Sequence, residues 1–420
     1  MESIKLPGNL TPKGLVLAVN TGSITTKYAV YRDGEIILDR KLEHSVQELS
    51  CFADVMDQEG MRTEAILGAL KENGIELEDI DIVMARGGLF TPCLTGVYNV
   101  NDDMREVLKS SRDGNHACNL SALIGENIAD TINKLRDQKG ITPRFGKCAA
   151  YVADPPMADE MLPECHVGGI PEFPRRTLFH ALNTRAIMRR YLRESGRKAE
   201  DTTAIICHMG GGVTISLHQD GRVIDTSHGL GGDGPITPER AGCCPPYPLI
   251  DMCFSGKYSK EEIKKKLIGK GGAVAYFGTN NMREIVQKAN EGIPEYVLFM
   301  KAFILNIAKY IVAQGAVVNG KVDDLDKPLV WEEDAVAPAR TRAIGVGTVV
   351  SVGFKLLGAL FKDNSSEKKL DAITKKVDWV APVKVYPGEN ELESLAENGY
   401  IILAGATKIH TYNKDHIVED

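Results

Sequence analysis

The chain has 420 residues, of which 43% are hydrophobic and 25% charged, a balance typical of an ordinary soluble globular protein. These proportions exclude wholesale disorder, a fibrous repeat and a multi-span membrane protein, and the length predicts about two or three domains. The net charge of −7 provides no general attraction to nucleic acid or an anionic membrane, so a phosphate site has to be built locally. Nine cysteines without a CxxC pair indicate reduced thiols in a cytoplasmic protein.

Two predicted β-hairpins, far apart in the chain, have the same design. The first covers residues 15–34, and its near turn is rich in small and hydroxyl side chains. The second covers residues 204–221, and its near turn contains Gly210-Gly211-Gly212. Each closes at an Asp-Gly turn. Because glycine lets a backbone approach a ligand and expose N–H groups to an anion, the pair predicts two phosphate-binding loops. The alternative is two unrelated hairpins with permissive turns.

Helical and strand patterns alternate along the rest of the chain. A separate apolar segment, 343–361, carries Lys355 near its centre and is short for a membrane span, which predicts a buried or interfacial segment. The alternation of helical and strand patterns predicts an α/β protein of two similar domains. The elements are an amphipathic helix at 63–72, a strand at 80–84, a helix carrying Ile124, Ile128, Ile132 and Leu135, a lysine-rich helix capped by Ser259 and Glu262, and a buried helix at 294–314.

Polar side chains suited to phosphoryl chemistry stand beside these strands and loops. Each has a plain structural alternative: a surface arginine, a helix cap at Asn119, a turn at Asp154, a core histidine or an acidic helix start. Together they include arginines, histidines and carboxylates but no Ser–His or Cys–His pair, which favours phosphoryl transfer by positioning and charge neutralisation. The residues are Arg86, His116, Asn119, Asp154, His180, Arg240, Glu389 and Glu391.

The order of motifs resembles the acetokinase family, most closely its butyrate kinases. The resemblance implies a two-domain actin-like (ribonuclease H-like) fold, with an extension at 1–14, an N-terminal domain at 15–178 completed by a helix at 391–412, and a C-terminal domain at 179–390. The motifs are Asn20-Thr-Gly-Ser23-Ile-Thr25-Thr-Lys27, Ala85-Arg86-Gly-Gly88, His116-Ala-Cys-Asn119, Tyr151-Val-Ala-Asp154-Pro155, Phe179-His180-Ala-Leu-Asn183, His208-Met-Gly-Gly-Gly212, Gly234-Pro-Ile-Thr-Pro238-Glu-Arg240 and Tyr386-Pro-Gly-Glu389.

The resemblance also implies an activity and roles for residues. The activity is direct transfer of a phosphoryl group from ATP to butyrate or a branched-chain fatty acid, with Mg²⁺, in a homodimer or higher homo-oligomer. Arg86 and Arg240 would hold the carboxylate and the phosphoryl group, and His180 would donate to the latter. His116 and Asn119 would also bind substrate. Asp154 with Glu389 or Glu391 would serve the metal. The nucleotide and its phosphates would be held by Asn20, Ser23, Thr25, Lys27, His208, Gly210, Gly211, Gly212, Asn281 and Arg283.

The chain departs from the family pattern in two places. Family members tend to have an aspartate where this chain has Asn281, and segment 323–369 replaces the strand and adenine loop expected there. These departures motivate a rival interpretation, a catalytically impaired paralogue acting as a binding or regulatory protein. A third alternative is an actin-like ATPase such as a chaperone. Against it, the pair Arg86 and Arg240, which would bind a carboxylate, has no evident role in ATP hydrolysis.

Overall fold

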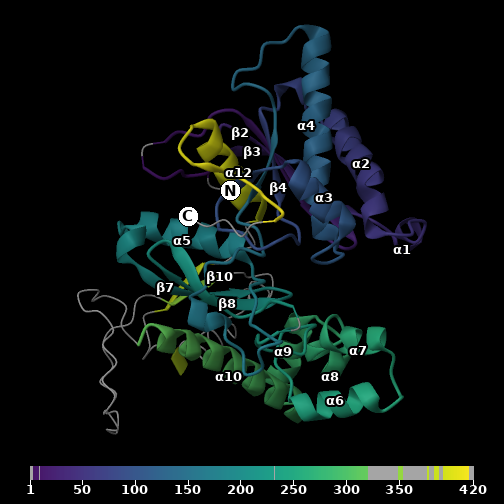
Figure 1. Cartoon of the computed structure of the whole chain (residues 1–420), viewed down its shortest axis with the longest axis vertical. Helices are drawn as coiled ribbons and strands as arrows, with labels where there is room; N and C mark the ends of the chain where they lie inside the picture. The colour runs from purple at the N-terminus through teal and green to yellow at the C-terminus, as the bar shows by residue number, and fades with distance from the viewer. Residues whose placement is uncertain are drawn as a thin grey trace. The chain divides into compact units, whose positions relative to one another are not determined.

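The computed structural model describes residues 3–8, 10–230, 232–319, 349–352, 376–377, 383–386 and 391–415. The chain forms two compact units, the first from Met1–Asp159, Ala181–Ala186 and Asn390–Asp420 and the second from Glu160–His180 and Ile187–Glu389 (Figure 1). The second unit therefore begins earlier than the expected boundary at 178. The reason is that the Leu162 N–H donates to the Ile224 carbonyl (3.0 Å) and the Val223 N–H donates to Oε2 of Glu160 (2.9 Å).

A seven-stranded mixed sheet in the order β12-β5-β6-β4-β1-β2-β3 forms the centre of the first unit. β1, β2 and β3 form an antiparallel meander, while β4 and β6 continue the sheet parallel to β1. All seven residues of β1 are buried, as expected for a strand covered on both faces. The strands are β1 (Leu15–Thr21), β2 (Thr25–Arg32), β3 (Glu35–Glu43), β4 (Ile82–Arg86), β5 (Val97–Asn99), β6 (Ala150–Ala153) and β12 (Ile409–Thr411).

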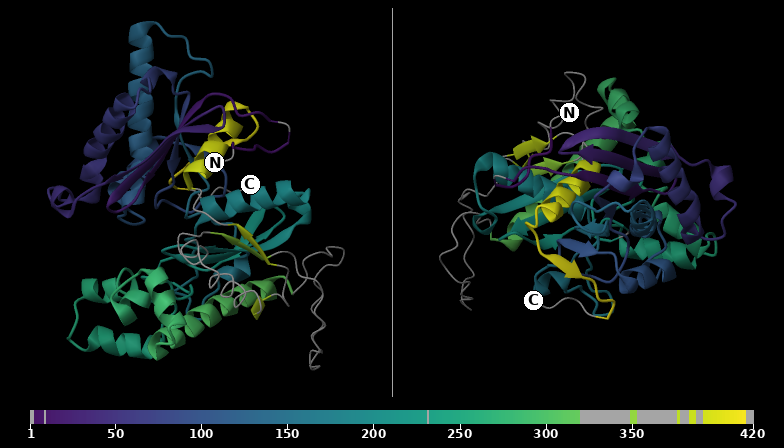
Figure 2. Two further views of the ribbon diagram at one scale, coloured as in Figure 1. Left: turned by 180° about the vertical axis from the view of Figure 1, so that it is seen from behind. Right: turned by 90° about the horizontal axis from the view of Figure 1, so that it is seen from above.

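Helices cover both faces of this first sheet (Figure 2). α2 (Glu59–Glu72) and α4 (Leu120–Lys139) pack on one face against Leu15, Leu17 and Val83. α12 (Glu391–Leu403) packs on the other face, against the alternate residues Val16, Ala18 and Met84. Successive side chains of a strand point to opposite faces, so this alternation divides the unit's apolar residues between two cores.

The second unit repeats the arrangement in a five-stranded sheet of order β11-β10-β7-β8-β9. β7, β8 and β9 form an antiparallel meander, and β10 and β11 extend the sheet parallel to β7. α5 (Ala181–Ser195) covers one face and α10 (Pro294–Val317) the other, as Figure 1 shows. The strands are β7 (Thr203–Met209), β8 (Val213–Gln219), β9 (Arg222–Thr226), β10 (Val349–Val352) and β11 (Val383–Tyr386).

Both predicted hairpins are confirmed, including their closing turns. Asp33 and Gly34 have φ of 49° and 87°, and Asp220 and Gly221 have φ of 51° and 77°. Two consecutive positive φ values define the turn whose twist matches a tight hairpin, and they explain why Asp-Gly occurs at both positions. The duplicated hairpin thus belongs to two sheets in which β6-β4-β1-β2-β3 of the first corresponds to β11-β10-β7-β8-β9 of the second.

The predicted long helix at 294–314 is only partly buried. Phe303, Ile307 and Ile311 of α10 pack into the core of the second unit, but Leu298 and Leu305 remain 69% and 45% exposed. α10 is long and apolar enough to cross a membrane, yet its inner face lies on a protein sheet. The prediction of burial is therefore wrong for the outer face of this helix.

The remaining helices each belong to one of the two units. The predicted capping box is confirmed, because Ser259 and Glu262 exchange bonds at the start of α7. The expected helix at 391–412 is shorter, since α12 ends at Leu403 and Gly405 takes a left-handed φ of 65°. Of segments 323–369 and 343–361, only β10 lies within the described residues. The other helices are α1 (Val46–Leu49), α3 (Asp102–Ser110), α6 (Pro246–Phe254), α7 (Lys260–Leu267), α8 (Gly272–Phe277), α9 (Met282–Asn290) and 3₁₀ turns at Val55–Gln58, Leu77–Asp79, Ala117–Asn119, Pro163–His166 and Ala199–Asp201.

Candidate functional site

Three predicted site residues stand at the carboxyl ends of neighbouring strands in the first unit. Asn20 lies near the end of β1, Arg86 ends β4 and Asp154 directly follows β6. β4 pairs in parallel with both β1 and β6, so the three residues occupy one edge of the sheet. In open α/β sheets ligands bind at this edge, and the strand order therefore groups the polar residues where a ligand site is expected.

Glu391 links two of these residues through α12. Nδ2 of Asn20 donates to Oε2 of Glu391, and Nη1 of Arg86 lies 3.5 Å from Oε1 of Glu391 and 3.3 Å from Oδ1 of Asn20. Asn183, at the start of α5, donates to the same Oε1 at 3.5 Å. Glu391 is 9% exposed and begins its helix, where the helix dipole favours a carboxylate. Glu391 thus holds Arg86 in place, whereas Glu389 lies outside the described residues.

Asp154 is held in an unusual backbone conformation. Its φ is 42°, in the left-handed region that aspartate tolerates better than most residues. Its N–H donates to the Gly96 carbonyl (2.8 Å) and its Oδ1 accepts from the Gly96 N–H (3.0 Å). Nε of Arg185 lies 3.8 Å from Oδ1. These contacts fix a buried carboxylate at the end of β6, beside the strand that carries Arg86.

The near turn of the first hairpin carries the other predicted phosphate-binding residues of this unit. Ser23 is exposed in the turn, Thr25 opens β2 and Lys27 is half-buried in β2. Before the turn, Oγ1 of Thr21 donates to the Ala117 carbonyl (2.6 Å), and the Thr21 N–H donates to Oγ of Ser121 (3.0 Å). Ser121, which the sequence did not single out, therefore ties the end of β1 to the start of α4.

Asn119 and His116, the predicted substrate-binding residues before α4, both form hydrogen bonds with backbone groups. Oδ1 of Asn119 accepts from the Leu89 N–H (2.8 Å) and its Nδ2 donates to the Gly114 carbonyl (2.9 Å). Asn119 forms no side-chain cap on α4, so the capping alternative is wrong for it. His116 does cap the 3₁₀ turn, because its Nδ1 accepts from the Cys118 N–H at 3.1 Å. Asn119 instead fixes the loop that follows Arg86.

On the second unit, three predicted site residues, Arg240, His180 and His208, lie around the turn Gly210–Gly212. A Cβ placed on Gly212 would lie 3.0 Å from Cζ of Arg240 and 3.2 Å from Cε1 of His180. The His180 ring stacks on His208, with centroids 3.8 Å apart and planes at 17°. Nδ1 of His180 lies 2.9 Å from Oγ1 of Thr214. An arginine and an imidazole thus flank a glycine turn, an arrangement suited to an anionic group.

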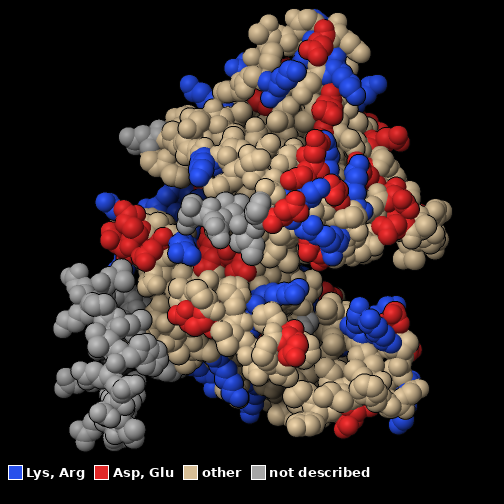
Figure 3. Space-filling view, in the orientation of Figure 1, with Lys and Arg blue, Asp and Glu red and all other residues tan. Residues whose placement is uncertain are grey.

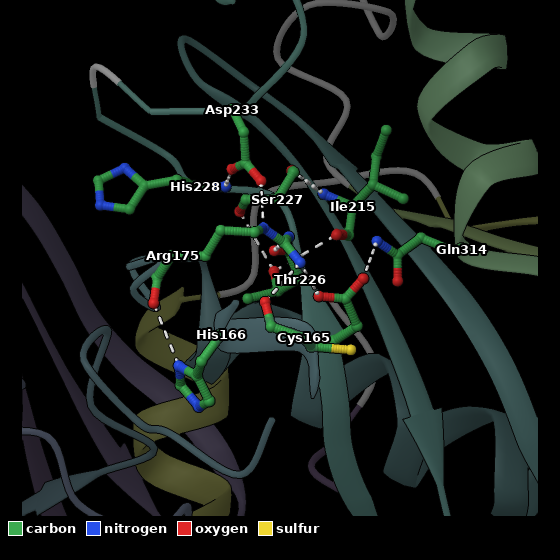
Figure 4. Close-up of polar contacts among 10 residues, drawn as sticks. Cys165, His166, Arg175, Ile215, Thr226, Ser227, His228, Asp233 and Gln314 are labelled. Atoms are coloured by element: carbon green, nitrogen blue, oxygen red, sulfur yellow. Dashed lines mark hydrogen bonds and ion pairs between the residues drawn. The ribbon is translucent and has the colours of Figure 1, made fainter. Parts of the chain in front are cut away.

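Arg175, to which the sequence assigned no role, bonds the loop that contains His228 and Asp233 (Figure 4). Its Nε donates to Oδ2 of Asp233 (2.6 Å) and its Nη1 to Oδ1 of Asp225 (3.0 Å). Asp233 also accepts from the His228 N–H at 2.9 Å. The same loop presents the Gly229 carbonyl, which accepts from Nη1 of Arg240. Arg175 therefore supports the loop that orients Arg240.

We expect Arg175→Met to lower the free energy of unfolding by about 2–3 kcal/mol at pH 7.5, since it strands the buried carboxylate of Asp225. Burial raises the pKa of Asp225, and Arg175 opposes that effect. Without Arg175 the pKa of Asp225 rises further, so the native state binds a proton more readily than the unfolded state. Stability is then lost as the pH rises above the unfolded value of about 4, and the deficit is smaller at pH 5.

Urea unfolding at pH 5 and pH 7.5 checks this expectation. The matched control is the double variant Arg175→Met/Asp225→Asn, which removes the stranded charge and should recover part of the loss at pH 7.5. An equal deficit at both pH values would contradict a role for the Asp225 charge.

Asn281 and Arg283 lie at the start of α9 and are both exposed. Oδ1 of Asn281 accepts from the Arg283 N–H at 3.2 Å, so Asn281 is the N-cap of this helix. The preceding Asn280 donates to Oε2 of Glu239 at 3.4 Å. This bond connects the predicted nucleoside segment to the residue next to Arg240.

Comparison with known proteins identifies the family. The chain is 37% identical over 397 residues to butyrate kinase 2 of Clostridium acetobutylicum, with 94% of this chain and 99% of that protein covered. The chain belongs to the acetokinase family. A probable butyrate kinase of Clostridium botulinum is 35% identical over 397 residues, which cover 94% of this chain and 99% of that protein. The model described as the acetokinase family matches residues 172–327, which include His180, the glycine turn and Arg240.

Solved structures of lower identity confirm the fold expected of an acetokinase. Acetate kinase of Porphyromonas gingivalis superposes with a TM-score of 0.66 at 16% identity, covering 93% of this chain and all of that one. A propionate kinase of Francisella tularensis superposes with a TM-score of 0.63 at 16% identity, with 92% and 98% covered. The predicted actin-like fold with two related sheets is therefore confirmed.

Proposed function

We propose that this acetokinase is a short-chain carboxylate kinase, which converts ATP and butyrate or a branched-chain fatty acid to ADP and an acyl phosphate. The observation that carries the proposal is the convergence of Arg240 and His180 on the turn Gly210–Gly212. Identity to butyrate kinases over nearly the whole chain supports the acceptor class. The same similarity favours a kinase over a catalytically impaired paralogue.

The proposed reaction needs little covalent help from the protein. A carboxylate oxygen forms a bond to the γ-phosphorus, the bond from that phosphorus to the bridging oxygen breaks, and ADP leaves with the electron pair. The acceptor is already ionised at neutral pH, so no general base is required. Catalysis then depends on positioning and charge neutralisation, for which Arg240 and His180 are placed beside the glycine turn. Arg86, fixed by Glu391, is the proposed carboxylate partner on the first unit.

Magnesium is proposed as the metal that accompanies ATP. Among the described residues no three His, Cys, Asp or Glu side chains cluster to form a protein-only metal site. Mg²⁺ in phosphoryl-transfer sites uses one or two carboxylates together with phosphate oxygens and water, so Asp154 and Glu391 suit it as oxygen ligands. When bound, the ion neutralises charge on the phosphates. We assign this role to Asp154 together with Glu389 or Glu391. We assign the site of action to the cytoplasm.

Self-association is proposed to involve the apolar outer surface of the second unit. Leu298 and Leu305 of α10 are exposed, as are Tyr247 and Phe254 of α6. In Figure 3 uncharged residues predominate over α6, whereas Lys, Arg, Asp and Glu intersperse on other parts of the face shown. Large apolar side chains gathered on a surface favour a protein–protein contact. A second copy of the chain is the partner that the family resemblance implies.

The test of the proposed function is a carboxylate panel. The protein with ATP and Mg²⁺ should form acyl hydroxamate from butyrate or isobutyrate when hydroxylamine is present, faster than from acetate. The difference between neighbouring acids should be about 10–200-fold per methylene group, because an apolar pocket discriminates one methylene by about 1–3 kcal/mol. An absence of product from acetate, propionate, butyrate and isobutyrate alike would refute the proposal. Nucleotide binding without product would instead favour the non-catalytic paralogue.

A further inference from the structure

A fully buried arginine lies beneath the near turn of the first hairpin. Arg62, in the first turn of α2, is 0% exposed and shares the inner face of that helix with Ile66 and Leu70. Burying a guanidinium is costly unless its N–H groups are bonded. In the part of the chain that the structure describes, Arg62 forms no ion pair with a carboxylate, so its hydrogen bonds go to neutral groups.

The guanidinium of Arg62 binds three carbonyl groups of the turn. Nη1 donates to the carbonyls of Gly22 and Thr25, both at 3.0 Å, and Nη2 donates to the carbonyl of Ser23 at 3.0 Å. Nη1 also lies 3.0 Å from Oγ1 of Thr26. On the helix side, Oε1 of Gln58 accepts from Nε (3.2 Å) and Nη2 (2.9 Å). One side chain from α2 thus bonds successive peptide groups of the turn, in addition to the backbone bonds that Gly22 and Thr25 exchange (2.7 and 3.4 Å).

The orientation of these carbonyls determines where the next amides point. In a planar trans peptide the C=O of one residue and the N–H of the next point in opposite directions. Since the carbonyls of Gly22 and Ser23 point toward Arg62, the N–H groups of Ser23 and Ile24 point away from it. Both residues are exposed, and among the described residues neither amide has a hydrogen-bond acceptor. Two successive outward amides form an anion-binding nest.

We propose that Arg62 is a positioning residue for phosphate binding, which turns the Ser23 and Ile24 amides outward and places a buried positive charge behind them. The ligand class is the phosphate chain of a nucleotide, and this assignment rests on the proposed function of the turn. The carbonyl oxygens of the turn would repel a phosphate, but they point toward the guanidinium of Arg62 and accept hydrogen bonds from it. Burial lowers the pKa of Arg62 and the negative charge of Glu48 raises it, so a bound anion would add a second favourable charge near the guanidinium. Arg62 acts through the turn and is not itself a catalytic residue.

The experiment compares binding of ADP and of adenosine by calorimetry in the presence of Mg²⁺. The proteins are the full-length wild type, Arg62→Met, Arg62→Lys and the control Arg40→Met, an exposed arginine on β3 of the same unit. Arg62→Met should weaken ADP binding at least about tenfold, the equivalent of one charge-assisted hydrogen bond, and leave adenosine binding within about twofold. Arg62→Lys keeps the positive charge but lacks the planar guanidinium and its set of N–H donors. Its affinity for ADP should therefore lie between those of wild type and Arg62→Met. Arg40→Met should match wild type.

Unchanged ADP affinity in folded Arg62→Met, or an equal loss of affinity for ADP and adenosine, would overturn the proposal. If Arg62→Met does not fold, as judged by circular dichroism, Arg62→Lys decides by the same criteria. Wild-type protein that binds no ADP would also overturn it. Acyl phosphate formation tests the kinase proposal separately, because ADP binding requires no carboxylate acceptor. A protein that binds ADP through Arg62 but phosphorylates no carboxylate would refute only the kinase proposal.

Discussion

Replacing Arg240 by alanine should lower kcat of the carboxylate kinase reaction by about 10³-fold or more, the scale on which an arginine stabilises phosphoryl transfer. Arg240 lies beside the glycine turn and beside His180, where it would neutralise charge that develops on the transferred group. Arg240→Lys keeps the positive charge but lacks the planar guanidinium, so its kcat should lie between those of wild type and Arg240→Ala. Hydroxamate formation from butyrate at saturating ATP measures the effect.

The matched control for Arg240 is Arg222→Ala, which removes an exposed arginine from the start of β9 in the same unit. The control should keep the wild-type rate, and both variants should unfold near the wild-type temperature. A kcat for Arg240→Ala above about one-tenth of wild type would rule out a transition-state role of the expected size.

A single methyl group at position 212 should also impair catalysis strongly. In Gly212→Ala the new Cβ would lie 3.0 Å from Cζ of Arg240, closer still to its Nη1, and 3.2 Å from Cε1 of His180. These atoms belong to side-chain ends that can move, so the free energy of unfolding should change by about 1 kcal/mol or less. Displacing two reacting side chains by about an ångström should lower kcat about 10²-fold.

Gly211→Ala is the informative comparison for Gly212→Ala. A Cβ on Gly211 would meet Oε1 of Glu239 at 3.8 Å, an ordinary van der Waals contact, so this variant should lose less activity. Steady-state kinetics and thermal unfolding of both variants separate displacement of Arg240 and His180 from loss of the fold. Equal losses in the two variants would show that backbone freedom, rather than these side chains, makes glycine necessary.

The hairpins show how much local sequence specifies about this fold. Asp-Gly turns with consecutive positive φ and buried apolar strands follow from short-range backbone preferences, so both hairpins were predictable. The motif order also predicted the family and the fold, which the comparisons confirm. The burial of α10 was predicted incorrectly because an apolar composition does not say which face of a helix meets the sheet.

Arg62 could have been noticed from sequence, since it continues the apolar stripe of Ile66 and Leu70 at helical spacing. A charged residue on the inner face of a helix requires partners, but the sequence does not identify them. Three of its partners are backbone carbonyls of a turn 37 to 40 residues away, and backbone groups carry no side-chain signal. Asn119 is similar, because its bonds to Leu89 and Gly114 depend on two loops that meet in space.

The sequence by itself therefore determined the two hairpins, the alternation of helices and strands, and the residues available for phosphoryl chemistry. Only the tertiary structure decided which of those residues meet. Asn20 and Glu391 are 371 positions apart, and they touch because α12 packs on the sheet that β1 and β4 form. Such contacts depend on strand order and helix docking, which are set by burial of whole faces and leave no local pattern in the sequence.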